Sequence, residues 1–141
     1  MYSSLVPLIG WVVTLGIIVL AFSKGGAPER LGALAMFLAA VAAFVVNAFA
    51  PAGVRPILLL ADEGLLGIVF LLLALRYTSP WLGVAMILQA IQFSLHAYYL
   101  VGQIPHDRTY AMINNLDSLG VLLCILIGTL LAWRKRMRAA K

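Results

Sequence analysis

The sequence predicts an all-α protein, a polytopic membrane protein folded as a compact up-down bundle of five transmembrane helices. Composition is the first observation, because 64% of the residues are hydrophobic and 11% are charged, whereas soluble domains carry about 25% charged residues. The apolar residues also form five runs, each near or above the roughly 20 residues that a spanning helix needs. The connections are only about 3 to 7 residues long, which leaves no room for a soluble domain.

The five predicted helices form one domain that fills residues 1–141. They are expected at residues 5–23, 31–49, 57–77, 81–102 and 110–133, followed by a short basic tail at 134–141. Segments rich in Gly and Pro separate the helices, as turns require. Connections this short make consecutive helices antiparallel neighbours, which predicts the up-down order.

The first two predicted helices, at residues 5–23 and 31–49, contain no ionisable residue. Residues 1–4 include no Lys or Arg, so the first run lacks the charged segment of a signal peptide and is expected to be retained. The second run carries small residues on one face, namely Gly32, Ala35, Ala39 and Ala43. Small residues at this spacing let helix backbones approach closely. This face is predicted to pack against another helix, either in the bundle or in another subunit.

Polar residues in the last three helices are the candidate ligand- or proton-binding residues, because lipid makes such residues costly. They are Asp62 and Glu63 in the third helix, Gln92 and His96 in the fourth, and Asn114 and Asp117 in the fifth. Counted from the helix ends at about 1.5 Å per residue, the ionisable groups lie about 9–12 Å deep, in one layer. Gln89, Gln92 and His96 share one face. Asp62 and Glu63 are about 100° apart on their helix, so one of the two is expected to point inward.

This layer of carboxyl, imidazole and amide groups has two interpretations. It could hold a cation, relay protons or bind a polar ligand, or it could be a hydrogen-bonded network that only joins helices. No metal and no other cofactor are predicted. Haem usually needs a second axial ligand, and the other histidine, His106, is in a loop. No Glu-x-x-His or His-x-x-x-His spacing supports a metal site. Ser118 lacks the surroundings of a nucleophile and is interpreted as a packing residue.

The basic residues predict orientation rather than nucleic-acid binding. With five spans, eight of the ten Lys and Arg residues fall on the side of the C-terminus. The positive-inside rule then places the N-terminus outside and the C-terminus in the cytoplasm. Those interpreted as topology and anionic-lipid contacts are Arg134, Lys135, Arg136 and Arg138. Trp81 and Tyr110 fall at the predicted inner and outer boundaries. The chain is broadly similar to small bacterial inner-membrane proteins, so the inner (plasma) membrane is its expected location.

Three functional hypotheses follow from these patterns. The first is a non-enzymatic transport or channel subunit whose outward-facing polar pocket binds a proton, a cation or a small ligand. It would act in an oligomer, since five helices with short connections enclose little pathway. The second is an accessory or scaffold subunit of a larger membrane complex, without activity of its own. The third is an intramembrane enzyme or quinone-binding redox subunit.

Overall fold

The computed structural model describes residues 2–140, which form five α-helices and contain no strand. The helices are α1 (Tyr2–Lys24), α2 (Ala27–Phe49), α3 (Arg55–Arg76), α4 (Pro80–Val101) and α5 (Arg108–Ala139). Each is long and apolar enough to cross a membrane. The largest difference from prediction is α5, which continues through most of the basic tail. Arg, Lys, Met and Ala favour helix, and no Gly or Pro interrupts the segment.

Local sequence signals set the helix starts. Pro28, Pro56 and Pro80 lie in the first turns of α2, α3 and α4, where a missing backbone N–H costs nothing. At the start of α2, the backbone N–H of Gly26 donates to Glu29 Oε2 over 2.9 Å. At the start of α5, Asp107 Oδ1 accepts from the backbone N–H of Tyr110 over 2.9 Å. Both carboxyl groups therefore satisfy an amide that the helix leaves free.

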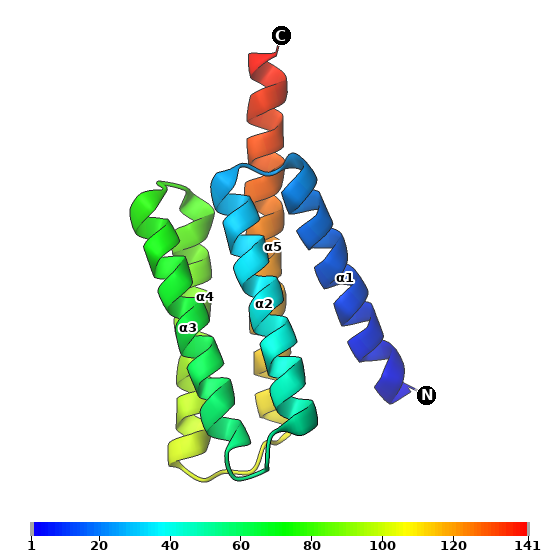
Figure 1. The fold of residues 1–141 in the computed structure, drawn as a ribbon, viewed down its shortest axis with the longest axis vertical. Coiled ribbons are helices and arrows are strands. Elements are labelled where there is room, and N and C mark those ends of the chain that lie inside the picture. The colour runs from blue at the N-terminus through cyan, green and yellow to red at the C-terminus, as the bar shows by residue number, and fades with distance from the viewer. Residues whose placement is uncertain (1, 141) are drawn as a thin grey trace.

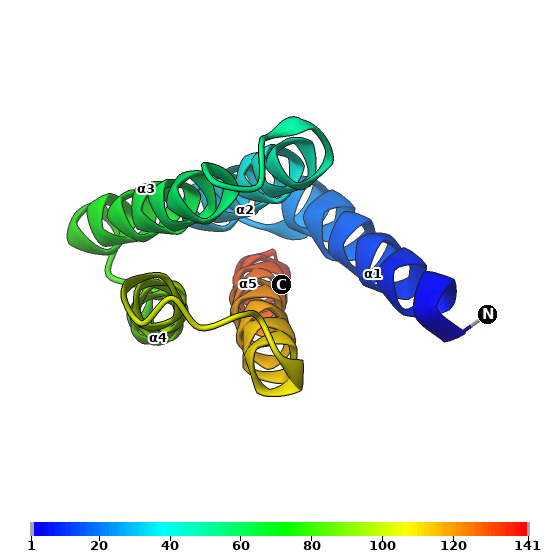
Figure 2. The same cartoon turned by 90° about the horizontal axis from the view of Figure 1, so that it is seen from below.

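The helices alternate in direction and stand in two rows (Figures 1 and 2). Consecutive helices contact one another, and α5 also contacts α1 and α2. Seen from below, α1, α2 and α3 form one row, and α4 and α5 the other (Figure 2). The N-terminus and the α2–α3 and α4–α5 connections share one end, here called the N-terminal end (Figure 1). Toward this end α1 leans away from α5 (Figure 1).

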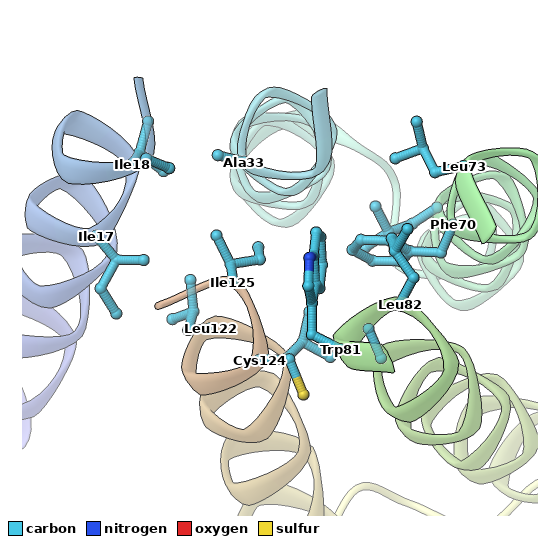
Figure 3. Close-up of a cluster of buried hydrophobic side chains, with 14 residues drawn as sticks. Ile17, Ile18, Ala33, Phe70, Leu73, Trp81, Leu82, Leu122, Cys124 and Ile125 are labelled. Atoms are coloured by element: carbon cyan, nitrogen blue, oxygen red, sulfur yellow. The ribbon is translucent and has the colours of Figure 1, made fainter. Parts of the chain in front are cut away.

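The apolar core fills the opposite, C-terminal half of the bundle (Figure 3). At its centre, the Trp81 ring lies edge-to-face with Phe70, with ring centroids 6.4 Å apart. Gly32 of α2 and Gly128 of α5 leave room for the indole, because a Cβ at either position would collide with it. Trp81 was predicted at a membrane boundary, and within the bundle it is 6% exposed. The core separates the N-terminal half from the C-terminal end.

Candidate functional site

Glu63 of α3 is the centre of a polar cluster in the N-terminal half of the bundle. Its carboxyl group accepts from Gln89 Nε2 and, over 3.2 Å, from Gln92 Nε2. Gln89 Nε2 also donates to the Glu63 carbonyl over 3.1 Å. Both glutamines lie on α4, one turn apart and on one face. Of the two adjacent acidic residues, Glu63 is therefore the one that points at the neighbouring helix.

Gln92 connects this carboxyl group to α5. Its Nε2 lies 2.7 Å from Asn114 Oδ1 and 3.3 Å from Ser118 Oγ, in addition to its contact with Glu63. An amide nitrogen carries two hydrogens, so three acceptors compete for two donors. Gln92 Nε2 therefore cannot donate to all three acceptors at once.

His96 lies one helical turn beyond Gln92 and borders the same groups. Its Nε2 is 3.4 Å from Asn114 Oδ1 and 3.9 Å from Glu63 Oε1. The Tyr110 hydroxyl lies 3.1 Å from the other ring nitrogen, Nδ1. Among the residues that the structure describes, His96 and Glu63 are the only basic and acidic side chains within 4.0 Å of each other. Among the described residues, no Lys or Arg side chain lies within 4.0 Å of the Glu63 carboxyl group to neutralise it.

An aromatic group covers the cluster at the N-terminal end. The His106 ring stacks on Tyr110 with centroids 3.8 Å apart and planes 8° apart. Tyr99 contacts the Tyr110 ring edge-on at 5.0 Å and donates its hydroxyl to Asp107 Oδ1 over 2.8 Å. The backbone N–H of Tyr110 and the Tyr99 hydroxyl lower the pKa of the Asp107 carboxyl group. Asp107 thereby fixes the α4–α5 connection over the cluster.

The polar cluster faces a cavity of about 320 Å³ with walls from all five helices. Its polar lining includes residues of every helix and of the α4–α5 connection, namely Thr14, Asn47, Asp62, Glu63, Gln92, His96, His106, Tyr110, Asn114 and Ser118. Part of the cavity wall comes from α2, through Ala39, Ala40 and Ala43. Their methyl side chains are too short to fill the cavity. No lining residue in the described part of the chain is Lys or Arg. The cavity is large enough for several waters or a small organic group.

The six predicted site residues fall into three groups: those in the hydrogen-bond network, one that lines the cavity without a side-chain hydrogen bond, and one outside the cavity. The hydrogen-bond network joins Glu63, Gln92, His96 and Asn114. Asp62 lines the same cavity and also a groove between α2 and α3, without a side-chain hydrogen bond in the described structure. Asp117 is 6% exposed and does not line the cavity. Its Oδ2 has no hydrogen-bond partner among the described residues, and neither has Oε1 of the buried Gln89.

Three further residues belong to this cluster and were not selected from the sequence. Gln89 is on the predicted polar face of α4, so its spacing could have identified it. Ser118 was interpreted as a packing residue, yet it is within hydrogen-bond distance of Gln92. Tyr110 was placed at a membrane boundary, yet it is 9% exposed and bonded to His96. An i, i+4 relation between Asn114 and Ser118 was the available signal for the serine.

The remaining predicted residues have structural positions. Gly32 contacts the Trp81 ring, Ala35 and Ala39 lie partly buried beside the core, and Ala43 lines the cavity. In the basic segment, the Arg136 guanidinium donates to the Lys24 carbonyl, and so joins α5 to the end of α1. The other three basic residues selected there are exposed, namely Arg134, Lys135 and Arg138.

Comparison of the chain with protein-family models, curated proteins and solved structures finds no match. Within the described residues, no group of three or more His, Cys, Asp or Glu side chains is arranged to hold a metal ion. The chemistry open to the cluster therefore follows from its own geometry. That geometry is a desolvated carboxyl group, an imidazole, a phenol and amide groups around one cavity.

Proposed function

We propose that the protein crosses a membrane five times and binds a proton or small cation at Glu63, as a transport or channel subunit. The observation that carries this proposal is the Glu63 carboxyl group, which is largely buried and has no Lys or Arg beside it among the described residues. Gln92 Nε2 is shared by three acceptors, and Oε1 of the buried Gln89 has no donor among the described residues. A proton or cation supplies the missing positive charge.

The apolar surroundings of the cluster make such binding favourable. The helices on either side are apolar enough to lie in lipid, where an uncompensated carboxylate costs about 2.5–3.5 kcal/mol or more. The Glu63 side chain is 14% exposed and its nearest basic group is His96, 3.9 Å away. Binding of a proton or cation between these groups offsets the cost. Release returns the site to the charged state, and this exchange is what a transport cycle needs.

The position of the cluster favours access from one side. The cavity lies toward the N-terminal end, while Phe70, Trp81 and Ile125 close the bundle toward the C-terminal end. The distribution of Lys and Arg supports a cytoplasmic C-terminus. The site would then face outward, and transfer across the core would require helices to move or a partner subunit to complete the path.

Ion flux into proteoliposomes tests the proposal. Purified protein would be reconstituted into liposomes that enclose a pH-sensitive dye. The fluorescence of the dye would be followed after the external pH or cation concentration is changed. Glu63→Gln keeps the size of the side chain and removes its charge, so we expect flux to fall to the level of empty liposomes. Ser94→Ala is the matched control, because Ser94 is an exposed α4 residue bonded only to the carbonyl of Ala90. Equal flux in wild type and Glu63→Gln would reject the proposal.

A second candidate is an accessory subunit in which the cluster only holds helices together. The observation in its favour is that Gln92 bonds to both α3 and α5. In that case Glu63→Gln would lower the free energy of unfolding, and flux would stay at the level of empty liposomes in the wild type and in both variants. Native mass spectrometry of the protein taken from its own membrane would then show masses that include other polypeptides. Masses of this chain alone would contradict the accessory role.

A further inference from the structure

A second, mainly apolar cavity adjoins the polar cavity beside α1. It is a groove of about 480 Å³ between the N-terminal half of α1 and α5. Its apolar wall includes Val6, Ile9, Val13 and Leu119, all of which are exposed. Four residues line both spaces, namely Thr14, Ala40, Ser118 and Leu122. The polar cavity and the apolar groove are therefore adjacent, and these four residues line both of them.

We infer that this double space binds an amphipathic amine, with its ammonium head in the polar cavity and its alkyl tail in the groove. The inference rests on the proposed function, because it assigns the substrate class of the same Glu63 site. In this arrangement the ligand reaches the cluster sideways, between α1 and α5, from the apolar phase around the helices.

The head group follows from the charge and the acceptors of the cavity. Glu63, Asn114 and Ser118 offer oxygen acceptors, and the Asp62 carboxyl group lines the same wall. An ammonium group is a cation with several N–H donors, so it supplies what the cluster lacks. A carboxylate or phosphate head is disfavoured, since no Lys or Arg among the described residues lines either space.

The route follows from what covers the cavity at its other openings. Toward the N-terminal end, His106 stacks on Tyr110 and both line the cavity. Toward the C-terminal end, the core around Trp81 closes the bundle. On the side toward α1 the cavity borders the groove, where α1 leans away from α5 (Figure 1). From Val6 to Val13 the groove follows α1 for about 10 Å, enough for a substantial part of an alkyl chain.

Binding of labelled amines to the protein in lipid nanodiscs tests the inference. Radiolabelled dodecylamine carries head and tail, propylamine carries the head with a short tail, and dodecanoate carries the tail with an anionic head. Signal from empty nanodiscs is subtracted to correct for partitioning. We expect dodecylamine and propylamine to bind to wild type and to lose binding in Glu63→Gln. Dodecanoate is expected to show no saturable binding.

A groove-filling variant separates the tail from the head. Gly10 lines the groove and has open space where a side chain would begin, so Gly10→Phe places a ring at the groove. Gly16→Phe is the matched control, because Gly16 is equally open and lies outside the groove. Burial of even a few methylenes is worth tenfold in affinity. We expect Gly10→Phe to weaken dodecylamine binding more than tenfold relative to Gly16→Phe, and to leave propylamine binding unchanged. Leu119→Trp, which fills the groove from α5, repeats the test.

The outcomes distinguish the two proposals. Equal dodecylamine binding in Gly10→Phe, Leu119→Trp and Gly16→Phe overturns the tail site, and saturable dodecanoate binding overturns the head assignment. Amine binding that ignores Glu63, together with proton flux that needs it, also overturns the inference while the proposed function stands. If neither binding nor flux depends on Glu63, both proposals fail.

Discussion

The indole Nε1 of Trp81 donates a hydrogen bond to Glu29 Oε1 over 3.1 Å, joining the first turn of α4 to the first turn of α2. Glu29 is 4% exposed, and its other carboxyl oxygen accepts from the backbone N–H of Gly26. One side chain therefore fixes both the start of α2 and the orientation of the largest ring in the core. The polar cavity depends on this contact, since the core that it orders forms the cavity's closed side.

Loss of the Glu29 carboxyl group is predicted to destabilise the fold. Glu29→Ala leaves the buried Trp81 indole N–H and the half-buried Gly26 N–H without this acceptor, and a buried unsatisfied donor costs about 1–3 kcal/mol. Unfolding in detergent, by heat or by SDS titration, would measure the loss. Arg30→Ala, at the neighbouring exposed position, is expected to change the free energy of unfolding little. A double-mutant cycle with Trp81→Phe should show coupling between the two side chains, and purely additive effects would contradict the assigned contact.

Two helical glycines, Gly128 buried in α5 and Gly83 exposed on α4, are predicted to respond to alanine with opposite signs. A Cβ at Gly128 would overlap the Trp81 ring, whereas a Cβ at Gly83 meets nothing within 4 Å. Gly128→Ala is expected to lower the free energy of unfolding by about 1–3 kcal/mol, as overpacking does. Gly83→Ala should raise it by up to about 1 kcal/mol through helix propensity. The same unfolding assay compares them, and a stabilised Gly128→Ala would show that the indole is not held against α5.

The pattern of apolar and polar residues was sufficient to predict the number and order of the helices. Helical phase also predicted that Gln92 and His96 share a face, and the structure places them there. The choice between Asp62 and Glu63 was open, because adjacent residues differ by about 100° and the rotation of a helix depends on its neighbours. The structure rotates α3 so that Glu63 reaches Gln89 and Gln92 on α4.

Tertiary packing also explains what the sequence did not predict. Trp81 and Tyr110 lie one or a few residues from helix starts, where tryptophan and tyrosine are typical of a membrane boundary. Both are also buried within the bundle, Trp81 because two glycines leave space for it and Tyr110 because His96 binds its hydroxyl. Those partners come from other helices. The long-range contacts cannot be read from periodicity along one helix.

The α4–α5 connection is predicted to lose stability in acid. The Tyr110 backbone N–H and the Tyr99 hydroxyl hold the pKa of Asp107 below its ordinary value, which is about 3.9 in an unfolded chain. A lowered folded-state pKa stabilises the native state above that value, and the contribution is lost as the pH falls through the folded-state pKa. Amide exchange at Tyr110, corrected for intrinsic rates, should therefore accelerate below about pH 4. In Asp107→Asn the corrected exchange rate should not depend on pH over this range. If the variant showed the same acceleration in acid as the wild type, the assignment to Asp107 would be contradicted.

Replacement of Asp117 by asparagine is predicted to separate stability from function. Its Oδ2 is buried without a hydrogen-bond partner among the described residues, and such an unsatisfied group costs about 1–3 kcal/mol. A natural protein that keeps this cost is expected to use the group, because costly polar residues within membrane spans mark functional positions. Asp117→Asn preserves the size of the side chain and removes its charge, so the free energy of unfolding should rise while proteoliposome flux falls. Increased stability with full flux would show that Asp117 takes no part in transport. A loss of stability would show that its carboxyl group has a partner that supports the fold.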